Sequence, residues 1–153
     1  MVDLETKTKF FEFVKSKQTA VIATISNTGK PSAATIYFLM DEKYTIYFMT
    51  KKFARKFENL QYDHEIALVI GMDNEPATVQ IEGVASQIIE EKEFDLRLKQ
   101  LKEKFFKNEF VAPLFQLSSE DKNDIVIYKI TPKWIRWLDL RRDKSDGEFI
   151  QIL

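Results

Sequence analysis

Three strand-like runs follow one another near the start of the chain, and short turns separate them. TAVIATIS (19–26), SAATIYFLM (32–40) and YTIYFMT (44–50) are rich in β-branched and aromatic residues, which favour strands. The turn signals NTGKP and DEK lie between them, and connections this short join antiparallel neighbours. The pattern predicts a three-stranded antiparallel meander, which restricts the chain to folds built from consecutive strands.

Further runs of the same composition follow this meander. They are IALVIG (66–71), ATVQIEGVASQII (77–89), DIVIYKI (124–130), KWIRWLDL (133–140) and, after the turn SDG, EFIQIL (148–153). We expect Thr131 and Pro132 to separate two of these strands, because proline cannot donate to a strand ladder. Gly83 lies inside a long run, where glycine marks a bulge or a close backbone approach. The sequence therefore predicts six to eight strands, mostly in consecutive antiparallel order.

Three segments have apolar residues at helical spacing, and they cover residues 4–16, 54–62 and 90–106. Asp3 is placed to cap the first helix, and we expect the second to bury Phe57 and Leu60. Residues 108–124 are irregular, with room for a short helix before Pro113. Many strands with few helices predict a mainly β protein, a small antiparallel barrel with peripheral helices in one domain spanning residues 1–153. An open sandwich is the alternative.

The composition excludes several classes of function. The 153 residues include no cysteine and one histidine, His64, so thiolate chemistry and a multi-histidine metal site are excluded. A net charge of -1 argues against broad binding to nucleic acid or to an anionic membrane. The sequence shows no signal peptide and no run of about 18 apolar residues, so we expect a cytoplasmic protein.

A dense group of positive charges marks the start of the second helix. Residues 50–56 contain four cations, Lys51, Lys52, Arg55 and Lys56. Cations at a helix N-terminus have the wrong sign for the helix dipole. Two interpretations remain open: solvent and the nearby Glu58 and Asp63 balance the charge, or a bound phosphate does so.

An ordered set of short motifs along the chain resembles one known family. The motif residues are Ala23, Thr24, Gly29, Pro31, Phe48, Thr50, Arg55, Lys56, Asn59, Leu60, Val79, Gly83 and Ala85. In this order they resemble the FMN-binding split-barrel family typified by pyridoxamine 5'-phosphate oxidase, including its short stress-protein and flavin-reductase-like relatives. The resemblance covers about residues 19–89, with a weaker match in ITPKWIRWLD. It implies an antiparallel split β-barrel that binds FMN.

The resemblance also implies positions for the cofactor. Thr50, Lys51, Arg55 and Lys56 would hold the flavin phosphate, next to Met49, and the backbone of Ala33, Ala34, Thr35 and Ile36 would line the isoalloxazine ring. Related proteins are homodimers with shared flavin sites, and Thr78, Gln80, Trp134 and Trp137 are our candidates for residues that complete the partner's pocket. The phosphate interpretation of the four cations follows from this resemblance.

The sequence also departs from the family pattern. Ala34 stands where the vitamin-metabolising oxidases carry a phosphate-binding Arg, and IRWLDLRR lacks the expected His, so we reject pyridoxamine 5'-phosphate oxidation as the activity. The remaining hypothesis is a flavin oxidoreductase that passes hydride or electrons from NAD(P)H to a small acceptor, with Tyr37 and Phe38 as stacking or gating groups. The alternatives are a carrier of flavin, haem or deazaflavin without turnover, and a cofactor-free dimeric barrel.

Overall fold

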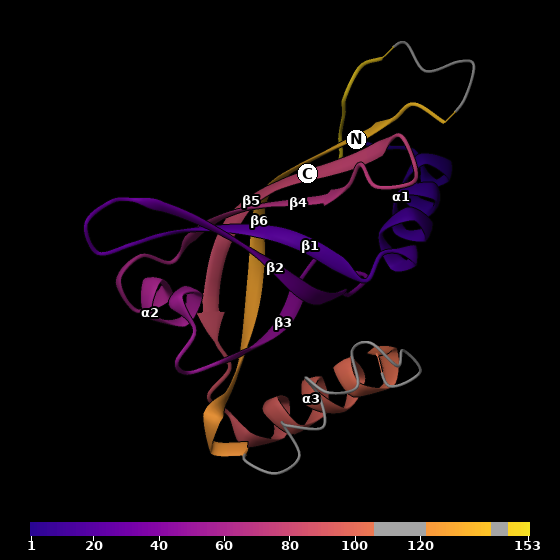
Figure 1. The fold of residues 1–153 in the computed structure, drawn as a ribbon. Coiled ribbons are helices and arrows are strands. Elements are labelled where there is room, and N and C mark those ends of the chain that lie inside the picture. The colour runs from indigo at the N-terminus through magenta and orange to yellow at the C-terminus, as the bar shows by residue number, and fades with distance from the viewer. Residues whose placement is uncertain (106–121, 142–146) are drawn as a thin grey trace.

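The strands of this protein close into a barrel with helices on its outside (Figure 1). The computed structural model describes residues 1–105, 122–141 and 147–153. The strands are β1 (Thr19–Ile25), β2 (Pro31–Met40), β3 (Ile46–Lys51), β4 (Glu65–Gly71), β5 (Ala77–Gln87), β6 (Ile125–Asp139) and β7 (Ile150–Gln151).

Pairing between the first and last members of the sheet closes the barrel. The strands lie in the order β3-β2-β1-β4-β5-β6, and β6 pairs again with β3, with Thr50 opposite Val126. All these pairs are antiparallel. The prediction of a closed antiparallel barrel is confirmed, and the open sandwich is excluded. The short β7 extends the sheet beyond β6.

The predicted break in the last strands is wrong. β6 continues through Thr131 and Pro132, because the pairing with β5 shifts at this point and Lys133 has no partner across the ladder. A bulge of this kind accommodates a proline, which has no backbone N–H to donate a hydrogen bond to the neighbouring strand. The bulge expected at Gly83 is confirmed, and a Cβ there would lie 2.6 Å from the carbonyl oxygen of Thr131, so the two backbones approach too closely for a side chain.

The helices are α1 (Leu4–Ser16), α2 (Arg55–Tyr62) and α3 (Glu91–Phe105), and a 3₁₀ helix covers Lys122–Asp124. In α1, Asp3 caps the helix by accepting from the backbone N–H of Thr6, as predicted. In α2, Leu60 is buried and Phe57 is half-buried. The expected end of the third helix at Phe106 and the expected short helix before Pro113 lie outside the described residues. No helix in the described ranges combines the length and apolarity needed to cross a membrane.

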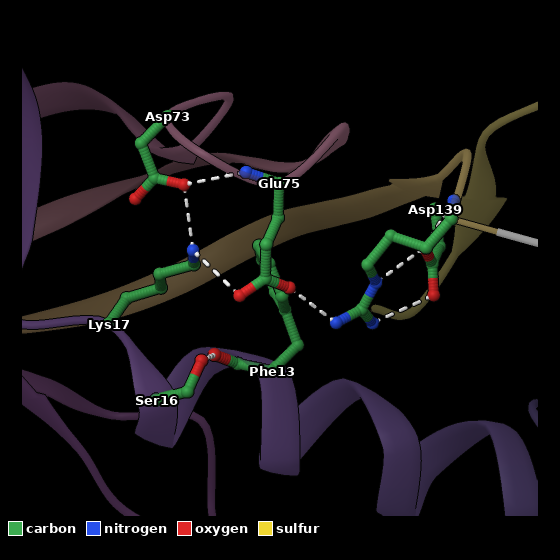
Figure 2. Close-up of polar contacts among 7 residues, drawn as sticks. Phe13, Ser16, Lys17, Asp73, Glu75 and Asp139 are labelled. Atoms are coloured by element: carbon green, nitrogen blue, oxygen red, sulfur yellow. Dashed lines mark hydrogen bonds and ion pairs between the residues drawn. The ribbon is translucent and has the colours of Figure 1, made fainter.

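A network of hydrogen bonds and ion pairs connects the end of α1 to the end of the barrel (Figure 2). The ammonium of Lys17 donates to Asp73 (2.8 Å) and to Glu75 (3.4 Å), and Arg141 joins Glu75 (2.6 Å) to Asp139 (2.8 Å). The hydrogen bond from Lys17 lowers the pKa of Asp73. The network therefore links the end of α1, the β4–β5 turn and the end of β6.

The third helix packs on the outer face of β2, β3 and β6. Its buried Leu98, Leu101 and Phe105 cover Tyr47 and Ile127. Near its end, the ammonium of Lys104 donates to the carbonyl oxygens of Lys17 (2.9 Å) and Phe38 (2.6 Å). Burial lowers the pKa of Lys104 to about 8, because the charged form loses hydration.

Docking of α3 should therefore make stability depend on pH in the alkaline range. The unfolded chain binds the Lys104 proton more tightly than the folded chain, so the free energy of unfolding should rise by about 1–2 kcal/mol from pH 7 to pH 9.5. The gain in the free energy of unfolding is complete above the pKa that Lys104 has in the unfolded chain. It is lost as the pH falls through about 8, the pKa of Lys104 in the folded chain. Urea unfolding at both pH values measures the rise, which should disappear in Lys104→Met.

The exposed Lys99 of the same helix provides the control, since Lys99→Met should retain the full rise. An equal rise in Lys104→Met and in the parent protein would show that Lys104 does not cause it.

Candidate functional site

A cavity opens on the outer surface of the barrel, where β2 and β3 meet the start of α2 and the start of β6. Its volume is about 210 Å³. The wall consists of Thr35, Ile36, Tyr37, Met49, Thr50, Lys51, Phe53, Ala54, Lys56 and Ile125. Tyr37 and Met49 also pack against the cluster under α3, so that helix supports one side of the cavity.

Six of the site residues predicted from the sequence meet at this cavity. They are Thr35, Ile36, Met49, Thr50, Lys51 and Lys56. The wall does not include Ala33, Ala34 or Arg55. Along β2, Ala33 is exposed and Ala34 packs against the barrel core, and the side chain of Arg55 is exposed at the first position of α2.

The four cations near the cavity have no acidic partner among the residues that the structure describes. No ion pair or side-chain hydrogen bond there involves Lys51, Lys52, Arg55 or Lys56. Asp63 instead accepts the backbone N–H of Glu65. The interpretation in which nearby carboxylates balance this charge therefore finds no support in the contacts.

Local electrostatics at the start of α2 favour an anion. Its N-cap residue, Ala54, has no side-chain oxygen to accept from the first N–H groups, which leaves them available to a ligand. Burial lowers the pKa of Lys56, because no anion compensates for its lost hydration. A phosphate at this end of the cavity would accept hydrogen bonds from the first N–H groups of α2 and from the ammonium of Lys56.

Two hydrogen bonds position α2 against the barrel. The amide of Asn59, which is 3% exposed, donates to the hydroxyl of Thr24 (2.9 Å), and the amide of Gln61 donates to the hydroxyl of Tyr128 (3.2 Å). Thr24 and Asn59 are both motif residues of the family pattern. The structure gives them a shared role, which is to fix the helix whose first turn borders the cavity.

Three residues of the cavity wall were not identified from the sequence as site residues: Phe53, Ala54 and Ile125. Phe53 is a large apolar residue within the cationic run, and it is 83% exposed. Ile125 follows a stretch of irregular sequence and reaches the cavity because β6 pairs with β3. Of the two expected gating groups, Tyr37 lies in the wall, but Phe38 points into the barrel core and is fully buried.

The residues expected to complete a partner's pocket lie away from this cavity. Thr78 donates to the carbonyl oxygen of Ile70 (3.1 Å), and Gln80 accepts from Arg136 (2.8 Å). The guanidinium of Arg136 also lies 5.0 Å from the ring centre of Trp134. Trp137 is different, because it is 3% exposed inside the barrel core. As placed, Trp137 is not available to a partner, which corrects that part of the expectation.

A closed antiparallel barrel of six strands with helices packed on its outside is the architecture of a split-barrel protein. Residues 6–139 match the family model of pyridoxamine 5'-phosphate oxidase. The protein belongs to this family, as the resemblance of its motifs indicates. Among curated proteins, no sequence matches this chain.

Solved structures share the fold at low sequence identity. General stress protein 26 from Bacillus anthracis is 23% identical, with a TM-score of 0.69, and the alignment covers 97% of this chain and 100% of that one. The heme storage protein HutZ from Vibrio cholerae is 19% identical with a TM-score of 0.67, covering 82% and 89%. ChuZ from Campylobacter jejuni is 14% identical with a TM-score of 0.78, covering 99% and 61%. At these identities the similarity concerns the fold alone.

Proposed function

We propose that the cavity binds FMN and that its phosphate lies at the start of α2. The observation that carries this proposal is the group of cations without acidic partners beside an uncapped helix N-terminus. Lys51 and Lys56 line the cavity and would donate charge-assisted hydrogen bonds to the phosphate. Thr50 would add its hydroxyl, and Arg55 would add its exposed side chain from the rim.

The remaining wall suits a flat, partly apolar ring. Ile36, Met49 and Ile125 would exclude water from it, and the phenol ring of Tyr37 offers a stacking surface. The backbone of β2 from Ala33 to Ile36 would approach the polar edge of the ring. When bound, FMN supplies hydride and electron transfer, and we propose a nicotinamide donor and a small acceptor as its substrates.

A second copy of the chain would complete this pocket. The volume of about 210 Å³ is below the roughly 300 Å³ at which ligand pockets usually begin. The outer face of β1 and β4 presents exposed Val21 and Val69 opposite each other, beside Ala23 and Ala67, and a homodimer would cover these apolar side chains. We propose that Gln80 and Trp134 of that copy reach the flavin, whereas Thr78 is 6% exposed and, like Trp137, is not available to it.

Comparing FMN with riboflavin tests the phosphate assignment directly, because the two ligands differ only in the phosphate group. Two lysines at 1.5–3 kcal/mol for each charged contact should together make FMN bind at least about a hundredfold more tightly than riboflavin, and the helix N-terminus should add to this preference. Calorimetric titration measures both affinities, and sedimentation of the same sample measures the dimer. Equal affinity for the two ligands would contradict the proposal.

A binding protein without turnover is the second candidate. The cavity wall contains no carboxylate and no imidazole among the described residues, so Tyr37 and the two lysines are its titratable groups. One structural neighbour is named as a heme storage protein, but His64 is exposed and lies outside the cavity wall. Bleaching of the bound flavin by NADH under anaerobic conditions would favour the oxidoreductase, and an unchanged spectrum would favour the carrier.

A further inference from the structure

The third helix, α3, packs on a cluster of its own outside the barrel (Figure 1). Its buried Leu98, Leu101 and Phe105 lie against Tyr47 and Ile127, and this cluster is separate from the core inside the barrel. Among the described residues, the core of the barrel includes none from α3. The helix can therefore leave its position without exposing the side chains that hold the strands together, as a locally opening unit does.

The chain is fixed to the barrel just before α3 begins. The backbone N–H of Ile88 donates to the carbonyl oxygen of Ile127 on β6 (2.9 Å). Glu90 then caps the helix, because its carboxylate accepts from the backbone N–H groups of Lys92 (3.1 Å) and Glu93 (2.8 Å). The cap moves with the helix, so α3 can turn about the short connection after Ile88 and keep its first turn.

At the other end, Lys104 holds α3 without a counterion. Its ammonium donates to the carbonyl oxygens of Lys17 and Phe38 and lies 4.5 Å from the ring centre of Phe38 and 5.2 Å from that of Phe105. In the described ranges, no carboxylate of α3, α1 or the strands pairs with Lys104, and the ammonium of Lys17 is bound to the β4–β5 turn. A charged Lys104 therefore loses hydration on docking and gains no ion pair.

The helix also supports the wall of the cavity. The ring of Phe105 meets the ring of Tyr37 edge to face, with 5.4 Å between the ring centres. Tyr37 and Met49 pack against the cluster under α3 and line the cavity as well. When α3 leaves, these two side chains lose their support on the side away from the cavity.

We infer that α3 is a detachable wall of the cavity, which opens as a unit while the barrel stays folded and which a ligand in the cavity holds closed. A ligand in contact with Tyr37 and Met49 needs both side chains in their supported positions, so ligand binding and docking of α3 favour each other. The opening follows from the packing of α3 alone, whereas the coupling rests on the proposed flavin site for its ligand. Protonation of Lys104 favours the open state, because the ammonium regains its hydration there.

Cysteine labelling can measure the opening, because the chain contains no cysteine of its own. Leu98→Cys places a thiol under α3, and Leu68→Cys makes the same change in the barrel core, where the two leucines are 4% and 1% exposed. The rate of alkylation of each folded variant, divided by the rate for the same variant in urea, gives its opening constant. Leu98→Cys should have an opening constant at least about tenfold larger, because its exposure does not require the barrel to unfold.

Two further measurements on Leu98→Cys test the response to pH and to a ligand. From pH 7 to pH 9 the opening constant should fall about tenfold, because opening takes up a proton as the pKa of Lys104 rises from about 8 toward 10.5. Adding Lys104→Met should abolish this fall, and adding Lys99→Met should preserve it. Saturating FMN should lower the opening constant at pH 7 severalfold.

Equal opening constants for Leu98→Cys and Leu68→Cys would overturn the inference, because α3 would then open only when the whole chain unfolds. If FMN binds in calorimetry but leaves the opening constant of Leu98→Cys unchanged, α3 is not coupled to the cavity, although the flavin proposal stands. If FMN does not bind, the flavin proposal fails, and the comparison of the two cysteine variants still decides whether α3 detaches. Amide hydrogen exchange of α3 and of the strands in the unmodified chain makes the same comparison if either variant fails to fold.

Discussion

Gly71→Ala should destabilise the protein by about 3–5 kcal/mol, a large part of the 5–15 kcal/mol typical of a folded domain. Gly71 ends β4 with φ +93°, a conformation that costs roughly 1–2 kcal/mol with any side chain. A Cβ there would lie 2.3 Å from the carbonyl oxygen of Ala77 and 2.8 Å from the ring of Phe13. The backbone or α1 must move to make room for this Cβ. Urea unfolding measures the resulting loss in the free energy of unfolding.

Gly29 provides the matched control for this substitution. It also has positive φ, at +76°, but a Cβ there would meet no atom within 4 Å. Gly29→Ala should therefore show the conformational cost alone, about 1 kcal/mol. Equal losses at Gly29 and Gly71 would mean that crowding by α1 and β5 contributes nothing.

Lys56→Ala should weaken FMN binding roughly ten- to two-hundredfold, given about 1.5–3 kcal/mol for a charged phosphate contact. Lys56 lines the cavity and lies in the first turn of α2. Its pKa is lowered by burial, so an anion at this position relieves the cost of burying its charge. Calorimetric titration of each purified variant with FMN measures the change.

Lys133→Ala is the control for loss of one positive charge. Lys133 is exposed on the bulge of β6 and pairs with Glu65 (2.7 Å), away from the cavity wall. Its FMN affinity should equal that of the parent protein. If Lys56→Ala also binds FMN like the parent, Lys56 does not hold the phosphate, and the proposed site loses its central residue.

Local patterns in the sequence were sufficient to predict most helices and strands of this fold. Runs of β-branched residues between turn signals located β1 to β5 to within three residues at each end, because strand propensity and turn chemistry act between near neighbours. The break at Pro132 was the exception, since a bulge opposite Gly83 compensates for the missing donor. That compensation depends on a partner strand about 50 residues earlier in the chain, which local reasoning does not see.

For the candidate site too, the sequence was sufficient for one part and the tertiary structure was needed for the rest. The sequence by itself determined the cationic run, the short helix that follows it and the strand that precedes it, because charge and periodicity can be read along the chain. Only the tertiary structure decided that Ile125 faces Lys51 and that Trp137 lies inside the barrel. These facts depend on how the barrel closes through β3 and β6, and backbone hydrogen bonds between distant strands carry no signature in either strand alone.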